Sequence, residues 1–388
     1  MLGNIIGSNL FNTLAVVGLA TAICPLVPGE DGAPAFSRYI LTRDIPLMFA
    51  LSLSITLFGL NWRHPLWPGA IQRKKALVWL LAFAAYTVLM FFQEVRAGGA
   101  SAAAAPVDFT AEDARFAFGT AEGLVANCTP RDAGTPEGRR AAEWILGELR
   151  RRGVEGRLDP FRAPAPGGTG EFVNVVAELR GARADAPWIV FLSHFDTAPT
   201  AGRPFDGAND GASTTGLMVA LAAAVRRAGP GDANVLFTWT DAEECRVAYA
   251  ADDGFQGAKR AVERLRSEGR QVLAAIGLDM LGDRNLRISI PANGDAALKQ
   301  VALRAARRAG LADDVFLDGH GVMDDFSAFH DAGWPAIDLI DFEYGSAPGR
   351  NDWWHTREDT LDKISAASLG KSGRLAAEML NLLEGRVK

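Results

Sequence analysis

The chain has 388 residues, which exceeds one ordinary domain and predicts two folding units. Its formal net charge of -6 and its pI of about 5.5 exclude a broad electrostatic attraction to nucleic acid. Three cysteines exclude a disulfide scaffold and a cysteine-cluster metal site, although a bond between Cys128 and Cys245 stays open. Hydrophobic residues make up 48% of the sequence, and they are concentrated in the N-terminal quarter.

Three apolar runs in the first hundred residues predict membrane-spanning helices. They cover Ile5–Val27, Ile45–Trp62 and Ala76–Phe92, and each is close to the roughly 20 residues that cross a hydrocarbon core. Three buried helices of a soluble domain are disfavoured, because no polar residue repeats at helical spacing within the runs. The loop 61–75 is rich in arginine and lysine and should lie in the cytoplasm. All that follows Phe92 is then expected on the periplasmic or extracytoplasmic side of the lipid bilayer.

These patterns divide the chain into three parts. We expect a transmembrane region over residues 1–93 and a flexible linker, rich in alanine, glycine and serine, over residues 94–108. Residues 109–388 are expected to form the second folding unit, outside the membrane.

The transmembrane region also carries a family resemblance. "GNIIGSNLFNTLAVVGLA", Gly3–Ala20, resembles the second alpha-repeat signature of the cation/calcium exchanger superfamily, and "RDIPLMFALSLSITLFGL" with the third apolar run is similar to the last two exchanger helices. The family's ion site also needs a preceding acidic helix and a first repeat, which are missing here, so Asn4, Ser8 and Asn9 supply only part of a coordination shell. The resemblance implies a membrane anchor derived from an exchanger, or the tail of a split or mis-started gene. The alternative is a transport protein with an accessory soluble domain.

From residue 109 onward, helical stretches alternate with short apolar strands. Thr135 as N-cap and Pro136 at the first helical position predict a helix that ends at Gly153. The predicted strands are "WIVFLSH", "NVLFTWT", "AAIGLDM" and "WPAIDLID", and the other predicted helices cover 214–228, 256–267, 296–309 and 366–383. This alternation predicts an α/β domain with three α/β/α layers and a mixed, mostly parallel sheet. In such sheets functional side chains gather beyond the carboxyl ends of the strands.

Polar side chains occur at those positions. They are His194 and Asp196 after the first of these strands, Asp241, Glu243 and Glu244 after the second, and Asp279 at the end of the third. Asp210 lies in the glycine-rich loop "GANDGAST", and His355 precedes the last helix. Each motif alone has a common structural explanation, such as a helix-capping turn or an exposed acidic pair. Their coincidence in a chain with only five histidines indicates a metal centre.

Imidazole and carboxylate ligands are those of catalytic zinc, and five of them can hold two ions if one carboxylate bridges. We expect Asp210 to bridge, with His194 and Asp279 on one metal and Glu244 and His355 on the other. Glu243 is then the general base for a metal-activated water. Asp196 is expected to orient the His194 ring. We interpret His320 and His330 as structural, since neither lies in a motif; other divalent ions stay open.

The motif order "HFD", "GANDGAS", "DAEE", "LDMLGD" and "WHTREDT" resembles the zinc aminopeptidase family that also contains glutaminyl cyclases. The resemblance covers nearly all of residues 110–388 and implies the zinc-exopeptidase fold and the roles given above. It also implies two zinc ions in the peptidase branch. Cyclases are similar but hold a single zinc, through the positions matching Asp210, Glu244 and His355.

The ligands do not separate these branches, so both stay open. Trp354 and the pair Asp324–Asp325 look like cyclase positions, where the residue matching Asp325 helps to hold the substrate amine; Phe326 departs from both branches. We therefore expect a membrane-anchored metallopeptidase of aminopeptidase type, which hydrolyses N-terminal peptide bonds of substrates with a free N-terminus. The alternative is a glutaminyl-peptide cyclotransferase with one zinc.

Overall fold

The computed structural model describes residues 104–387. The membrane-spanning helices expected in the first 93 residues lie outside the described residues. Within residues 104–387 we find no helix that is both long and apolar enough to cross a membrane. The described residues belong to one compact unit, Ala103–Lys388.

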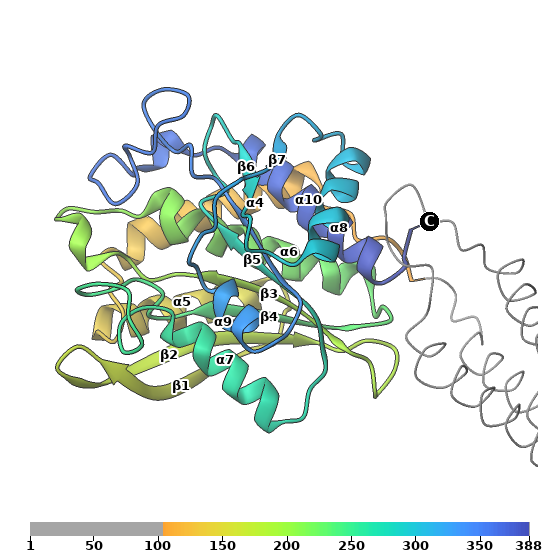
Figure 1. Ribbon diagram of the computed structural model, residues 1–388, viewed down its shortest axis with the longest axis horizontal. Coiled ribbons are helices and arrows are strands. Elements are labelled where there is room, and N and C mark those ends of the chain that lie inside the picture. Colours follow the sequence, from red (N-terminus) through yellow and green to blue (C-terminus); the bar gives the residue numbers. More distant parts are fainter. Residues whose placement is uncertain (1–103, 388) are drawn as a thin grey trace, which may run out of the picture. The chain divides into compact units, whose positions relative to one another are not determined.

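Eight strands form one sheet in the order β1-β2-β4-β3-β5-β8-β6-β7 (Figure 1). The strands are β1 Gly156–Ala165, β2 Gly168–Leu179, β3 Trp188–His194, β4 Asn234–Thr240, β5 Val272–Asp279, β6 Ile288–Ile290, β7 Val315–Leu317 and β8 Ala336–Ile340. The four central strands, β4, β3, β5 and β8, are parallel, while the β1–β2 hairpin joins β4 in antiparallel fashion. At the other side the parallel pair β6–β7 runs antiparallel to β8. The predicted mixed, mostly parallel sheet is confirmed.

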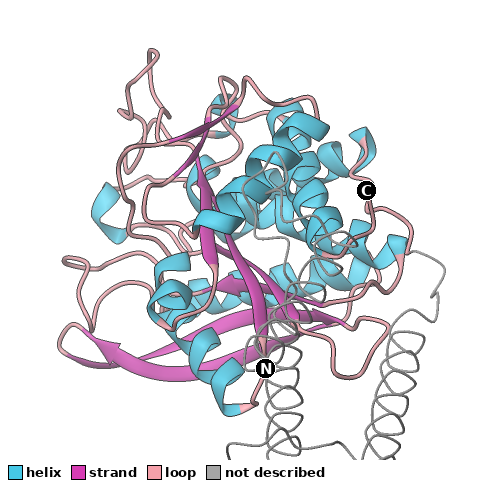
Figure 2. Cartoon of the chain, turned by 45° about the vertical axis from the view of Figure 1, so that its right-hand side comes forward, coloured by secondary structure: helices cyan, strands magenta, loops and turns pink. Residues whose placement is uncertain are grey.

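Helices cover both faces of this sheet (Figures 1 and 2). They are α4 Ala111–Cys128, α5 Pro136–Arg151, α6 Thr214–Ala228, α7 Gln256–Ser267, α8 Ala296–Arg308, α9 Phe326–Asp331 and α10 Ala366–Leu383. Helices α7 and α9 contact each other and lie on one face, whereas α4 packs with α5, α6 and α10 on the other. The result is the α/β/α layering that the sequence predicts.

Strand β3 is a continuous apolar run because each face of the sheet packs against a hydrophobic core. All seven of its residues are buried, because alternate side chains of a strand point to opposite faces of the sheet. Ile189 and Phe191 pack into the larger core with α4 and α6. Val190 and Leu192 pack into the smaller core, with residues of α7 and α9. A strand covered on both faces therefore needs no polar alternation.

Local signals placed most of the elements correctly. Thr135 caps α5 by accepting the Gly138 backbone N–H at 3.0 Å, with Pro136 at the first position, although the helix ends at Arg151 rather than Gly153. Helices α6, α7 and α10 have the predicted bounds, and α8 ends one residue early. The β1–β2 hairpin, α4, β6, β7 and α9 are elements that the sequence analysis did not predict. Strand β1 is an edge strand with two prolines and only two buried residues, a pattern with little apolar periodicity.

The chain enters this domain next to its C-terminus. Asn381 at the end of α10 exchanges two hydrogen bonds with the Val107 backbone, at 2.7 and 3.0 Å. Arg386 donates to the Ala105 carbonyl oxygen at 2.6 Å, and its buried partner Glu384 accepts the Ala233 N–H just before β4. The entry point therefore lies at the amino ends of the parallel strands. Candidate metal ligands lie at the opposite, carboxyl ends.

Candidate metal centre

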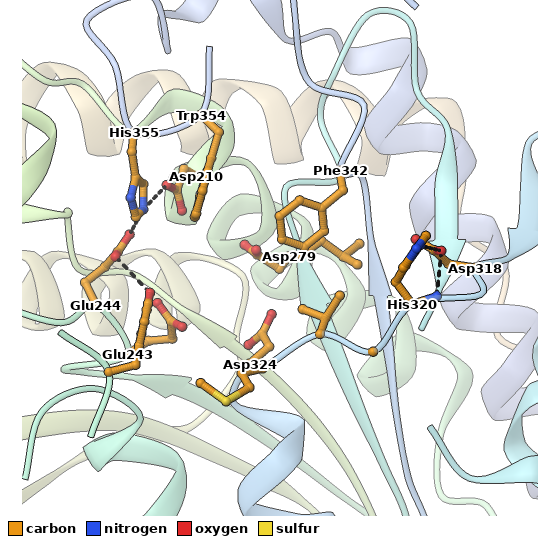
Figure 3. Close-up of a pocket in the computed structure, with 15 residues that line it drawn as sticks. Asp210, Glu243, Glu244, Asp279, Asp318, His320, Asp324, Phe342, Trp354 and His355 are labelled. Carbon is orange, nitrogen blue, oxygen red and sulfur yellow. Dashed lines mark hydrogen bonds and ion pairs between the residues drawn. The ribbon is translucent and has the colours of Figure 1, made fainter. Parts of the chain in front are cut away.

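The five predicted ligands come together in the structure. His194 is the last residue of β3 and Asp279 the last of β5, while Glu244 follows β4. Asp210 lies in the tight turn Ala208–Ser213 before α6, and His355 in the loop between β8 and α10 (Figure 3). Among the described residues, three groups have ligand atoms within 4.8 Å of one another: His194 with Asp210 and Asp279, Asp210 with Glu244 and His355, and His194 with Glu243 and Glu244. We call the first the closed group and the second the open group.

Asp210 serves both groups with different oxygens. His194 Nε2 lies 3.1 Å from Asp210 Oδ1 and 3.3 Å from Asp279 Oδ1. His355 Nε2 lies 3.3 Å from Asp210 Oδ2 and 3.1 Å from Glu244 Oε1. Tetrahedral zinc with bonds of about 2.0–2.1 Å separates its ligand atoms by about 3.3 Å. The donor types and their spacing therefore fit zinc in either group.

Residues with strained backbone conformations lie at or next to the candidate ligands. Only four non-glycine residues among the described ones have positive φ: Ala242 at 57°, Met280 at 53°, His355 at 53° and Phe255 at 58°. One is a candidate ligand, and two adjoin Glu243 and Asp279. Such conformations are unfavourable and persist where the surrounding fold imposes them, commonly at functional sites.

The turn that carries Asp210 is held by side chains that the sequence analysis did not identify. Asp359 accepts the backbone N–H of Asn209 at 2.7 Å and of Asp210 at 3.1 Å. Asn209 in turn donates to the Met280 carbonyl oxygen at 3.0 Å. Gly211 has a φ of 89°, and a Cβ there would lie 3.0 Å from the His194 ring. Asp210 is therefore fixed between the ends of β3 and β5.

Arg131 is a buried cation beneath this turn. Its guanidinium donates to the carbonyl oxygens of Phe195, Asp206 and Gly207 at 2.5, 2.7 and 2.6 Å. Burial lowers its pKa, and the nearby carboxylates, Asp359 first and then Asp210, raise it. The sequence analysis did not identify Arg131 as part of the site. The positive charge balances part of the acidic centre.

Asp196 contacts the loop that carries the predicted base. Its two oxygens accept the backbone N–H groups of Glu243 at 3.3 Å and Glu244 at 3.2 Å. Asp196 Oδ1 also lies 3.6 Å from His194 Nδ1, which is an ion-pair distance rather than a hydrogen bond. Asp196 thus links the end of β3 to Glu243 and Glu244.

The pKa values of the candidate ligands and of Glu243 are shifted, as expected for a buried cation site in which protons balance the acidic charges when no metal is bound. Burial, and then Glu244, hold the pKa of Glu243 well above its usual range, while burial and Asp210 raise the pKa of Glu244 to about 7. Burial opposes ionisation of His355, but Asp210 and Glu244 outweigh it and raise its pKa to about 10. Burial alone would raise the pKa of Asp210, but hydrogen bonds from His194 and His355 outweigh this effect and lower its pKa. Buried like charges of this density are stabilised by a metal ion or by protons.

A pocket of about 380 Å³ opens onto the open group. Its wall contains Asp210, Glu244, His355, Glu243 and Asp279, whereas His194 is not among the described residues that line it. The aromatic part of the wall contains Tyr249, Trp354, which stacks on His355 at 4.1 Å, and Phe342, whose ring lies 5.9 Å from that of Trp354 (Figure 3).

The adjacent acids of "MDDF" have different surroundings. Asp324 lines the pocket, while Asp325 is buried and bonds to the Thr240 hydroxyl. Burial, and then the carboxylates of Asp338 and Asp279, hold the pKa of Asp324 well above its usual range.

The two histidines outside the motifs also differ. His320 lines the far wall of the pocket, so its interpretation as merely structural does not describe its position. His330 lies on the surface at the end of α9. Cys128 and Cys245 are both buried free thiols, so they do not form the bond that the sequence left open.

Two family models match the chain. Residues 174–380 match peptidase family M28, and residues 1–92 match the sodium/calcium exchanger protein family. Over 90 residues the chain is 40% identical to CaxA of Alkalimonas amylolytica, named as an antiporter, which covers 23% of this chain and 25% of that protein. Over 212 residues it is 26% identical to aminopeptidase YwaD of Bacillus subtilis, covering 52% of this chain and 42% of that one. The chain thus spans less than half the length of either relative.

Solved structures resemble the domain over nearly their whole length. A glutaminyl cyclase from an Acidobacteriales bacterium has a TM-score of 0.67 and 31% identity, covering 74% of this chain and 99% of that one. A Zn-dependent exopeptidase from Parabacteroides distasonis has a TM-score of 0.62 and 22% identity, covering 71% and 98%, and shows the shared fold.

Proposed function

The chain belongs to peptidase family M28, whose model matches more than half of it, and on that premise we propose that its domain is a zinc-dependent glutaminyl-peptide cyclotransferase. The domain is an enzyme, and its relatives are metallopeptidases and glutaminyl cyclases. The proposed reaction closes an N-terminal glutamine to pyroglutamate and releases ammonia.

The observation that carries this proposal is the asymmetry of the two ligand groups. All three residues of the open group, Asp210, Glu244 and His355, line the pocket together with Glu243, whereas the closed group contributes Asp210 and Asp279 but not its histidine, His194. One zinc in the open group is therefore enough to meet a substrate. The 31% identity to a glutaminyl cyclase over 99% of its length supports the same choice.

The residues of the pocket can perform the proton transfers of this reaction. Bound zinc would polarise the side-chain amide carbonyl of the substrate. Glu243 accepts a proton from the α-amine as its nitrogen bonds to the amide carbon, and returns the proton to the nitrogen that leaves as ammonia. Its raised pKa suits both halves of this transfer. No water is consumed, so a pocket with apolar walls at Trp354 and Phe342 favours cyclisation over hydrolysis.

The substrate amine needs an acidic partner. The sequence assigned this contact to Asp325, but Asp324 is the acid that lines the pocket. We therefore assign the amine contact to Asp324, with Asp325 supporting the wall through Thr240.

A second candidate, the aminopeptidase that the sequence favoured, has its own support. The closed group has the same donor spacing as the open group and shares Asp210 with it. Zinc in both groups would give the two-metal arrangement of a hydrolase, with Glu243 as base for water and Asp196 holding its loop.

The N-terminal match to exchanger proteins supports membrane anchoring, and the basic loop 61–75 is the reason for proposing that the domain lies on the extracytoplasmic side. Because the chain enters the domain at the amino ends of the parallel strands, the pocket at their carboxyl ends lies at the opposite edge. Access of added protease to the domain in intact cells tests this side, and protection there would contradict it.

The full chain in detergent, loaded with zinc, tests the reaction. A cyclase binds one zinc per chain and releases ammonia from glutamine peptides without cleaving them. An aminopeptidase binds two and releases free amino acids. Absence of both products from zinc-loaded chain would refute both functions.

A further inference from the structure

One wall of the pocket is formed by residues 318–323, a segment held in place by hydrogen bonds, which we call the outer wall. Asp318 N–H donates to the Ile290 carbonyl oxygen at 2.9 Å, and Ala292 N–H donates to that of His320 at 2.8 Å. The Asn293 side chain exchanges two hydrogen bonds with the Val322 backbone, at 2.7 and 3.0 Å. These bonds fix the outer wall to the segment after β6, so that its surface is formed before a ligand arrives.

Met323 on the outer wall is unusually exposed for its type. It lines the pocket with 65% of its surface accessible. The other large hydrophobic residues exposed within residues 104–387 are Val247, Leu273 and Leu317, and none of these three lines the pocket. Val322, half-buried beside Met323, extends this surface towards Phe342. An apolar surface at the mouth of a pocket favours an apolar partner.

The outer wall is also placed to meet the residue that follows the reacting one. In Figure 3, His320 and Asp318 lie at the end of the pocket opposite to Glu244 and His355, with Phe342 between them. If the first residue of a peptide occupies the open group, the chain leaves towards the outer wall. Asp318 on the outer wall repels a second carboxylate.

We propose that the outer wall binds the side chain of the second substrate residue and selects an apolar side chain over an acidic one, with Met323 as the main contact. This inference rests on the proposed action at a peptide N-terminus. It names the substrate class as peptides in which an apolar residue follows the N-terminal glutamine.

The test compares zinc-loaded full chain on three peptides with a free N-terminal glutamine and an amidated C-terminus, which differ only in their second residue: leucine, serine or glutamate. Wild type is expected to prefer leucine over serine by about tenfold in kcat/KM, through KM, since burying an apolar side chain contributes on that scale. Met323→Ser should lose this preference and Met323→Leu should keep it. Leu317→Ser is the matched control: Leu317 is 49% exposed just before the outer wall, does not line the pocket, and its variant should behave as wild type.

The failures are distinguishable. If no peptide yields ammonia or a free amino acid, the proposed function fails and this inference fails with it. If the three peptides react equally well, or Met323→Ser slows all of them by the same factor, the inference fails while the function stands. The identity of the product decides cyclase against peptidase independently of the second residue.

Discussion

The closed and open ligand groups share Asp210 but are built differently. In the closed group, His194 and Asp279 are the last residues of two paired strands, and His194 is 2% exposed. In the open group, Glu244 and His355 lie on loops, and His355 is 20% exposed. The parallel register sets the first group, while loop conformation and positive φ set the second.

We therefore expect the closed group to contribute mainly to stability and the open group mainly to catalysis. The imidazole of the closed group is buried at a strand end, so an ion there would mainly hold Asp210 in place. The open group lies on loops beside Glu243 and all three of its residues line the pocket, so an ion there would polarise the reacting carbonyl. If the comparison is correct, matched changes in the two groups have unequal effects.

The largest expected effect comes from matched histidine substitutions. His355→Ala should remove the zinc of the open group and reduce turnover at least about ten-thousandfold, because only two carboxylates of that group, Asp210 and Glu244, would remain. His194→Ala should retain one zinc per chain and lose about tenfold. Zinc content and ammonia release measure both variants. If both variants lost all activity, the two groups would not differ as described, and the result would favour the two-zinc peptidase.

Glu243→Gln should lower kcat about a thousandfold with its zinc content unchanged, because the variant cannot accept the proton. Glu263→Gln, an exposed glutamate on α7, is the control and should match wild type. A variant that lost zinc as well would make Glu243 a ligand rather than the base.

Tyr249→Phe tests how the open group is held. The Tyr249 hydroxyl lies 3.3 Å from Glu244 Oε2, and its ring stacks on Phe255 at 4.7 Å, a contact that phenylalanine keeps. Zinc affinity, measured by competition with a chelator, should weaken about tenfold. Val247→Ala in the same exposed loop is the control. Unchanged affinity would mean that His355 and Asp210 alone position Glu244.

The smallest expected effect is a reversal of pH dependence by zinc. The folded pKa values of Glu244 and Asp359 are raised to about 7, chiefly by burial, so the metal-free fold binds more protons than the unfolded chain. Its free energy of unfolding therefore falls as pH rises from about 4 to 7, and Tm should fall by several degrees between pH 5.5 and 8. Excess zinc, which needs deprotonated ligands, should reverse the slope. A metal-free Tm that rises over this range would contradict the raised pKa values.

The sequence determined much of the fold because its signals are local. Apolar runs such as "WIVFLSH" and caps such as Thr135 with Pro136 act within a few residues, and the structure has those elements where they were expected. The sequence also predicted that the five candidate ligands lie close together, since strand ends in a parallel sheet meet at one edge. The edge hairpin β1–β2 was missed because an exposed edge strand carries little apolar periodicity.

Only the tertiary structure decided which of these residues face a substrate. The adjacent residues Asp324 and Asp325 look equivalent in the sequence, which does not show that Asp324 lines the pocket while Asp325 bonds to Thr240. The sequence also does not show that His320 lines the pocket, or that Arg131 lies beneath the turn that carries Asp210. The physical reason is that residue type and spacing fix which ligands and bases are present. Access, burial and charge balance depend on contacts between segments far apart in the chain.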